Sequence, residues 1–279
     1  MEHRNRYLTR IISIVNQKGG VGKTTTAVSL SSCLAEARRH TLLLDVDPQG
    51  NATSGLGWPK KDLSRTVFDL LIDDSPLESI LLPTPVEGLW LAPSNNDLLS
   101  VELELAGDDQ GKFTLKKSLA RFFWERSAEA RPDYVIIDCP PSLSLLSLNA
   151  ILASDSIVIP VQCEYYALEG LTEILASASM IRQSFNPRLS LEGILLTMAD
   201  RRLNLSRQVE EDIRQAYKEY VFETVISRSV RLSEAPSHGL PITQYDPESP
   251  GARAYQELTQ EVINHETKSA RPWPVRPSL

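Results

Sequence analysis

Cysteine, aromatic side chains and long apolar runs are all scarce in this chain of 279 residues. Its three cysteines, Cys33, Cys139 and Cys163, stand far apart without a CxxC pair. That spacing argues against a disulfide framework and against a zinc or iron–sulfur site built by one chain alone. The longest uncharged run covers residues 139–154 and holds two prolines, whereas a bilayer span needs about 20 apolar residues. We therefore expect a soluble, cytoplasmic protein without a membrane partner.

An excess of positive charge is missing as well. The chain holds 29 Lys and Arg against 36 Asp and Glu, a net charge of −7. This balance argues against a protein that is coated with positive charge and binds nucleic acid under all conditions. It leaves room for a local basic patch. Hydrophobic residues at 42% and charged residues at 23% are ordinary for a globular protein, so neither a fibrous nor a disordered chain is expected.

Short apolar runs alternate with longer segments of helical period along most of the chain. The runs are rich in Val, Ile and Leu without apolar–polar alternation, which suits strands covered on both faces. Strands are expected at residues 11–15, 41–46, 89–92, 134–137, 156–161, 191–197 and 221–226. Helices are expected at residues 23–38, 95–106, 115–127, 143–153, 168–183, 205–217 and 251–265.

This order of elements predicts an α/β fold: a doubly wound, mostly parallel sheet flanked by helices. No repeat or long linker divides the chain, so a single domain is expected over residues 1–267. Residues 57–85 form the least regular region. Residues 268–279, with three prolines and one tryptophan, are expected to form a flexible tail.

A glycine-rich turn between a predicted strand and a predicted helix carries the strongest functional signal. Such a turn lets backbone N–H groups surround phosphate oxygens, and the helix N-terminus adds its partial positive charge. Lys23 would reach the β- and γ-phosphates of a nucleotide, and the Thr24 hydroxyl would ligate Mg²⁺. Gln17 stands where the standard P-loop pattern has its first glycine. The expected phosphate-binding set is Lys18, Gly19, Gly20, Val21, Gly22, Lys23, Thr24 and Thr25.

Three aspartates follow predicted strands. Asp45 and Asp47 end the strand at residues 41–46, and Asp138 ends the strand at residues 134–137. Ligands of open α/β sheets lie at the carboxyl ends of strands, so these carboxylates are expected to face the phosphates. A single aspartate after a strand is more often a turn or helix-cap residue. Three of them together with the glycine-rich loop favour a nucleotide site.

These segments resemble the ParA/MinD family of deviant-Walker-A ATPases, in particular its short, chromosomal Soj-like ParA branch. Residues 18–25 look like the deviant Walker A motif of this P-loop family, residues 45–51 like its Walker A′ segment, and residues 138–142 like its Walker B segment. Residues 162–170 and 230–237 are similar to motifs of the ParA branch. The resemblance extends from about Arg10 to about His265.

The resemblance implies an ATPase with ATP and Mg²⁺ as cofactors and with Lys18, Lys23, Asp47 and Asp138 as catalytic residues. Lys18 would contact the nucleotide of the partner subunit in an ATP-bound homodimer, and Asp47 would position the attacking water. Thr24, Asp47 and Asp138 would hold Mg²⁺, partly through water. The family implies slow hydrolysis stimulated by a ParB-like centromere-binding protein, and an ATP-bound dimer that binds DNA without sequence preference and is therefore nucleoid-associated.

Two arginines, Arg202 and Arg231, match positions that contact DNA in Soj-like relatives. Residues 182–231 hold nine basic against seven acidic residues, so the local excess is small. A solvated surface with intrahelical ion pairs is the alternative interpretation of such arginines. Any DNA binding would need the patches of two subunits and would be sensitive to salt.

Three other functions stay open at this point. A ParA-like ATPase could position a cargo other than DNA, and a MinD-like division-site regulator shares the loop motifs. That branch docks on lipid through a basic amphipathic C-terminal helix, which the three prolines of residues 268–279 disfavour. A nitrogenase-reductase-like protein would need cysteines at positions that this chain does not use. Chromosomal and plasmid partition both fit the motifs.

Overall fold

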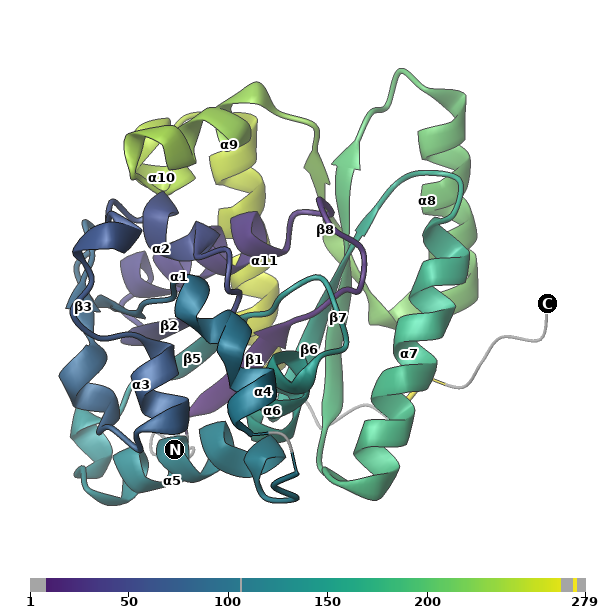
Figure 1. The fold of residues 1–279 in the computed structure, drawn as a ribbon. Helices are drawn as coiled ribbons and strands as arrows, with labels where there is room; N and C mark the ends of the chain where they lie inside the picture. Colours follow the sequence, from purple (N-terminus) through teal and green to yellow (C-terminus); the bar gives the residue numbers. More distant parts are fainter. Residues whose placement is uncertain (1–8, 106, 267–272, 275–279) are drawn as a thin grey trace, which may run out of the picture.

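The computed structural model describes residues 9–105, 107–266 and 273–274. In these residues one sheet of eight strands has the order β3-β4-β2-β5-β1-β6-β7-β8, and β3–β4 is its antiparallel pair (Figure 1). The strands are β1 (Arg10–Ile14), β2 (Thr41–Asp45), β3 (Leu82–Pro83), β4 (Leu89–Ala92), β5 (Tyr134–Asp138), β6 (Ser156–Gln162), β7 (Ser190–Ala199) and β8 (Val221–Ser227).

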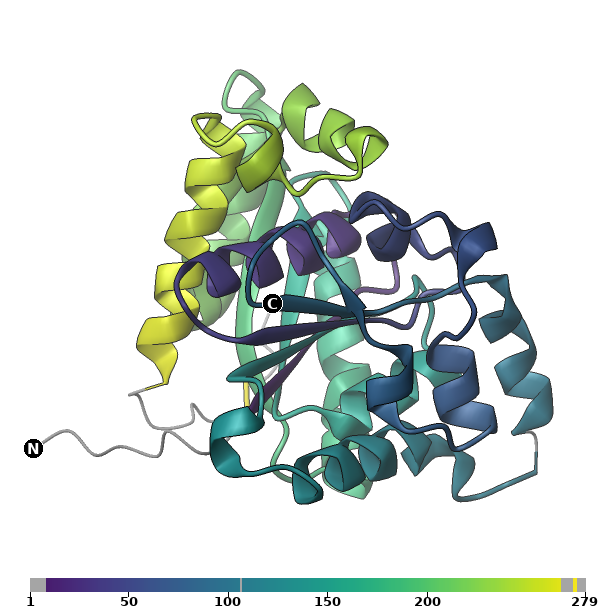
Figure 2. The same ribbon diagram turned by 90° about the vertical axis from the view of Figure 1, so that its left-hand side faces the viewer.

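Helices cover both faces of this sheet. In Figure 1, α7 and α8 lie side by side on one side of β7, and α11 lies on the other side; Figure 2 shows α1 and α5 on opposite faces. The α-helices are α1 (Lys23–Glu36), α2 (Asn51–Gly55), α3 (Val67–Ile72), α4 (Val101–Glu104), α5 (Thr114–Trp124), α6 (Leu145–Ala153), α7 (Ala167–Ser184), α8 (Asn204–Tyr217), α9 (Val230–Glu234), α10 (Ile242–Tyr245) and α11 (Pro250–His265). The predicted doubly wound α/β fold is confirmed.

Consecutive residues of the central strands point into two separate apolar clusters. In β2, Leu42 and Leu44 belong to the cluster beneath α5, α6 and α7, whereas Leu43 belongs to the cluster beneath α1 and α11. All three leucines are at most 2% exposed. Because both faces of the sheet are buried, both sets of positions must be apolar, which explains why the strand segments show no alternation.

Parts of the chain between residues 50 and 107 differ from the prediction. The helix expected at residues 95–106 is a 3₁₀ turn, Asn96–Ser100, followed by the single turn of α4. The Asn95 side chain accepts a hydrogen bond from the Asp97 N–H at 3.1 Å, and this cap starts the tighter turn. The region expected to be irregular contains α3 and β3. The tail expected over residues 268–279 lies outside the described residues, apart from Trp273 and Pro274.

The three cysteines are small buried side chains. All three thiols are free. Burial raises the pKa of Cys33 to about 12 and that of Cys163 to about 11. Burial and the neighbouring Asp138 charge raise the pKa of Cys139 further. None of them therefore has the lowered pKa of a reactive cysteine.

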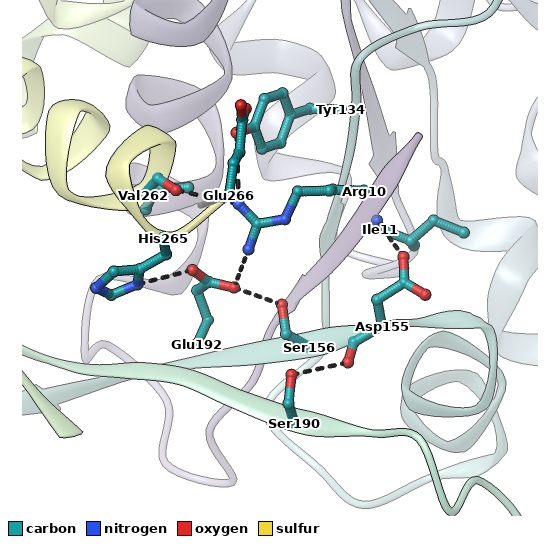
Figure 3. A network of polar contacts seen from close by, with 10 residues as sticks. All are labelled: Arg10, Ile11, Tyr134, Asp155, Ser156, Ser190, Glu192, Val262, His265 and Glu266. Carbon is teal, nitrogen blue, oxygen red and sulfur yellow. Dashed lines mark hydrogen bonds and ion pairs between the residues drawn. The ribbon is translucent and has the colours of Figure 1, made fainter. Parts of the chain in front are cut away.

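A buried polar network fastens α11 to the amino ends of the strands (Figure 3). Arg10 Nη2 lies 2.5 Å from Glu192 Oε2, and the Ser156 hydroxyl donates to the same oxygen at 2.8 Å. The His265 Nδ1 lies 3.0 Å from Glu192 Oε1, and Arg10 also donates to the Val262 carbonyl at 3.0 Å. Glu192 is 5% exposed. The network thus joins β1, β6 and β7 to the last turn of α11.

The carboxyl group of Glu192 is held in its charged form. Burial by itself raises the pKa of this group, but the hydrogen bond from His265, the Arg10 charge and the Ser156 hydroxyl outweigh it and lower the pKa below 4.5. A lowered carboxyl pKa stabilises the fold above the pKa of the unfolded chain. That stabilisation is lost as the pH falls through the lower folded-state pKa.

We predict that Glu192→Gln lowers the free energy of unfolding by about 2 kcal/mol at pH 7, because it leaves the partly buried Arg10 guanidinium without its anion. Urea unfolding followed by circular dichroism measures this change. Glu257→Gln, at an exposed position of α11, is the control and should change stability little. The difference between Glu192→Gln and the parent protein should close under acid conditions that protonate Glu192; a gap that persists there would contradict the explanation.

Candidate functional site

The loop between β1 and α1 has the backbone of a phosphate-binding turn. Gly20 and Gly22 have φ angles of +75° and +90°, which residues with a side chain rarely adopt. Asn16 fixes the start of the loop: its side chain donates to the Pro160 carbonyl at 2.7 Å and accepts from the Lys18 N–H at 3.0 Å. No side chain caps the N-terminus of α1. The first N–H groups of this helix are therefore left for an anion.

Lys23, the first residue of α1, folds back over this loop. Its ammonium group donates to the Lys18 carbonyl at 2.9 Å, and the residue is only 6% exposed. Burial lowers the pKa of Lys23, while the charges of Asp138 and Asp47 act in the opposite direction. The loop thus contains a partly desolvated cation that faces two carboxylates.

Two of the predicted carboxylates occupy neighbouring positions at the carboxyl edge of the sheet. Asp45 and Asp138 are the last residues of β2 and β5, and they are register partners in that parallel pair. Both are fully buried. Burial raises the pKa of Asp45 to about 6 against the opposing hydrogen bonds from Thr53, and the charge of Asp47 raises it too. Burial and the charge of Asp45 raise the pKa of Asp138 well above its usual range.

The predicted carboxylates have different partners. Asp45 accepts two hydrogen bonds from Thr53, from its N–H at 2.8 Å and its hydroxyl at 2.7 Å, and so fixes the start of α2. Asp47 accepts from the Gln49 N–H at 2.9 Å and is 6% exposed. Neither oxygen of Asp138 makes a hydrogen bond of normal geometry within the described residues, although the Thr24 hydroxyl lies close enough to lower its pKa.

The unsatisfied carboxylate of Asp138 fits a magnesium site. A buried carboxylate without hydrogen bonds of normal geometry needs a cation or water, and the Thr24 hydroxyl beside it would supply a second oxygen to a cation there. In the described part of the chain, no group of three or more His, Cys, Asp or Glu side chains is arranged to hold a metal by itself. This agrees with Mg²⁺ chemistry, in which one or two protein oxygens act together with substrate phosphates and water.

A cavity of about 500 Å³ opens directly beside the N-terminus of α1. Thr24 and Thr25 line one end of it, Met198 and Arg228 line a second wall, and Pro236 belongs to a third. The walls come from the ends of β7 and β8 and from the turns after α9. Met198, Arg228 and Pro236 do not belong to the site that the sequence predicts. Of these, Pro236 lies in residues 230–237, which are similar to a motif of the ParA branch.

The end of β7 also braces the phosphate loop. The Thr197 hydroxyl donates to the Val21 carbonyl at 2.9 Å. The next residue, Met198, has a φ of +51°, an uncommon conformation for a residue with a side chain. Strain of this kind persists where surrounding contacts over-determine the backbone, and it is frequent at ligand sites.

Lys18 lies on the outside of the loop. Its side chain is 52% exposed and forms an ion pair with Glu164, which belongs to the motif of residues 162–170. The backbone carbonyl of Lys18 accepts from Lys23, as described above. The residue therefore touches the phosphate loop through its backbone, while its ammonium group is directed to the surface.

The predicted DNA-contact arginines lie in the segments that follow two neighbouring strands. Arg202 follows β7 and Arg231 lies in α9 after β8, and the Arg228 N–H donates to the Ala199 carbonyl at 3.1 Å between the two segments. Arg202 is paired with Asp200 at 2.7 Å, and Arg231 with Glu234 at 3.1 Å. The Arg202 hydrogen bonds lower the pKa of Asp200 to about 2. Both arginines are exposed, but each already has an acidic partner.

Comparisons with known proteins place this chain in a family. A family model described as an AAA domain matches residues 9–191. The chain is 51% identical over 253 residues to the sporulation initiation inhibitor protein Soj of Bacillus subtilis, covering 91% of this chain and 98% of that protein. It is 49% identical over 263 residues to the chromosome partitioning protein ParA of Myxococcus xanthus, covering 94% and 91%.

The chain belongs to the ParA/Soj family of chromosome-partitioning ATPases. Membership confirms the resemblance seen in the motifs, and with it the P-loop ATPase class.

Some solved structures that are similar to this chain contain a bound nucleotide. A structure described as cobyrinic acid a,c-diamide synthase from Mycobacterium smegmatis with bound ADP and magnesium has a TM-score of 0.81 and 35% identity to this chain. The alignment covers 95% of this chain and 99% of the Mycobacterium smegmatis chain. The same protein has been solved with an ATP analogue and magnesium. No helix in the described ranges combines the length and the apolar character that a membrane crossing requires.

We predict that Asp138→Asn stabilises the nucleotide-free protein by about 2 kcal/mol at pH 7, because it removes a buried charge whose oxygens accept no hydrogen bond of normal geometry within the described residues. A carboxyl group whose pKa is raised in the folded chain destabilises the fold as the pH rises above the ordinary pKa of that group. The gain should therefore shrink toward pH 4. Urea unfolding in EDTA at the two pH values measures it, with Asp62→Asn as the control at an exposed position. A variant less stable than the parent at pH 7 would contradict this picture of the site.

Proposed function

We propose that this ParA/Soj family member is a DNA-segregation switch in which bound Mg–ATP controls dimerisation and DNA binding. The observation that carries the proposal is the phosphate loop with Lys23 beside the unsatisfied carboxylate of Asp138. Identities of 49% and 51% to relatives named for chromosome partitioning and for Soj support the cellular role. Cargo other than DNA is the alternative, and the DNA-retention experiment below tests it.

The nucleotide would lie along the N-terminus of α1, with its phosphates in the glycine-rich loop and its base in the adjoining cavity. Lys18, Gly19, Gly20, Val21, Gly22, Lys23, Thr24 and Thr25 make up the proposed phosphate-binding set. Lys23 would exchange the Lys18 carbonyl for phosphate oxygens, which needs rotation of one side chain and no change of the loop. Met198 and Pro236 would border the base.

Magnesium would be held by Thr24 and Asp138, with Asp47 close by, and when bound it would neutralise charge on the phosphates. Asp47 would orient the attacking water. Two hydrogen bonds hold Asp47 in place for this role. Its carboxylate accepts from the Gln49 N–H, and its backbone carbonyl accepts from the Ser94 hydroxyl at 2.6 Å. Hydrolysis positioned by one carboxylate and without a strong base is expected to be slow. We propose that a ParB-like centromere-binding protein accelerates it.

Lys18 is proposed to act across a homodimer. Its exposed ammonium group is paired with Glu164 in the single chain, so it would have to leave this pair to reach the phosphates of a second subunit. There it would neutralise phosphate charge in the way that an arginine finger does. Dimerisation would then depend on ATP, because the Lys18 ammonium group can pair with phosphates across the interface only when the second subunit holds a nucleotide.

DNA binding is proposed for the surface formed by Arg202 and Arg231. Each subunit alone offers few phosphate contacts, and the acidic partners of both arginines weaken them further. A dimer doubles the contacts on one DNA duplex. Residence on DNA would thus follow the ATP state.

Two lysine variants separate nucleotide binding from dimerisation. We predict that Lys23→Ala weakens ATP binding by about 100-fold or more, because it removes the cation that faces the phosphates. Lys18→Ala should still bind ATP but stay monomeric. Calorimetry measures the first change and light scattering with ATP the second. Lys117→Ala, at an exposed position of α5, is the control for both. Normal ATP affinity in Lys23→Ala would reject the phosphate site, and an ATP-dependent dimer of Lys18→Ala would reject the trans contact.

A pair of charge reversals tests the DNA surface. The double variant Arg202→Glu with Arg231→Glu should still dimerise with ATP but lose DNA retention. Any DNA binding that is left should depend less on salt concentration, because up to about four phosphate contacts per dimer are removed. Gel retardation at several salt concentrations measures this. Arg188→Glu, an exposed position at the opposite end of β7, is the matched control. Retention at the parent level in the double variant would refute the surface.

A further inference from the structure

Two residues near the end of the chain pack on the side of the molecule formed by α7 and α8. Trp273 and Pro274 are both half-buried. Trp273 packs against the apolar cluster beneath α7, and the Arg182 guanidinium lies 5.9 Å from the centre of its ring. These contacts involve none of the residues assigned to nucleotide or DNA.

The surface beneath Trp273 has the form of a groove between the two helices. Thr172, Ala176 and Ser179 follow the spacing i, i+4, i+7 and therefore share one face of α7. These short side chains leave room for an indole. Tyr217, the last residue of α8, forms the other wall and shares a hydrogen bond of 3.2 Å with Thr172. We call this groove the α7–α8 seam.

The seam is larger than the side chain that now lies in it. A cavity of about 130 Å³ remains between Trp273, Pro274 and the two helices. This volume holds several waters by the share of about 30 Å³ that a water takes in the liquid. The seam can therefore accept a segment longer than the two residues described. In the sequence, prolines at 272, 274 and 277 restrict the backbone of such a segment and reduce the entropy lost when it docks.

A different face of α7 contacts the phosphate loop. The Gln17 side chain donates to the Ser177 hydroxyl at 3.5 Å. Glu164, three residues before α7, pairs with Lys18. A segment docked in the seam thus packs on the same helix that touches the loop.

We propose that the α7–α8 seam is a peptide-docking site for the C-terminal segment of this chain, with Trp273 as its anchor, and that the docked segment restrains α7. The indole provides the large apolar contact, Arg182 covers its face, and the small residues of α7 set the depth of the groove. Because the segment is tethered, its effective concentration at the seam is of the order of mM, so the chain fills its own groove.

The experiment uses the full chain and a labelled peptide of residues 268–279. The Trp273→Ala protein has lost the anchor and should bind this peptide in a fluorescence anisotropy titration. The parent protein should bind it at least about tenfold more weakly because its own segment competes. A peptide with alanine in place of tryptophan should not bind. Ala176→Arg, introduced into the Trp273→Ala protein at an exposed position of the groove, should abolish peptide binding.

Hydrogen exchange gives the second measurement. The α7 amides of Trp273→Ala should exchange about tenfold faster than those of the parent protein, and saturating peptide should restore the slow rate. Trp124→Ala, whose side chain is 87% exposed at the end of α5, is the control and should leave α7 unchanged. Absence of peptide binding to Trp273→Ala, or α7 exchange equal to the parent, would overturn the proposal. Self-association of the parent that depends on Trp273 would overturn it too, because the occupant would then be a second copy.

Discussion

The balance between one buried ammonium group and two buried carboxylates is the constraint on which the site depends. Lys23, Asp45 and Asp138 lie at the carboxyl edge of a sheet whose two faces are apolar, so the charges have little water around them. The raised pKa values of the aspartates and the lowered pKa of Lys23 show that desolvation dominates over attraction here. The apolar clusters on both faces stabilise the fold enough to hold these charges in place.

The same carboxyl groups also determine the local architecture. Asp45 begins α2 through Thr53, and the carbonyl of Asp47 accepts from Ser94, which follows β4. The Asp138 oxygens make no hydrogen bond of normal geometry within the described residues, and the Thr24 hydroxyl lies close by. Although the three aspartates look equivalent in the sequence, their hydrogen bonds distinguish them: Asp45 and Asp47 each fix part of the backbone around them, whereas the Asp138 oxygens make no such bond of normal geometry in the part of the chain that the structure describes.

The sequence predicts those elements whose structure is decided by burial and by local spacing. The apolar segments around Leu43 and Ile136 predict central strands, and the spacing of Gly22 and Lys23 predicts the phosphate loop. Elements that depend on contacts between distant parts of the chain could not be predicted from the sequence. The five-residue α9 has no strong helical signal of its own, and Leu232 is held there by close packing on Gly251 of α11. Likewise, the pairing of Arg202 with Asp200 follows from a turn that the spacing does not reveal.

The burial of the three thiols has a consequence for the control of this molecule. A cysteine reacts with oxidants as its thiolate, and here both access and ionisation are suppressed. Cys139 directly follows Asp138 in the chain, so oxidation of its sulfur would add a polar group next to that buried carboxylate. Because burial keeps its thiol protonated and covered in the folded chain, Cys139 is a poor target for oxidants. The same desolvation that raises the pKa values of the neighbouring carboxylates thus keeps this thiol unreactive.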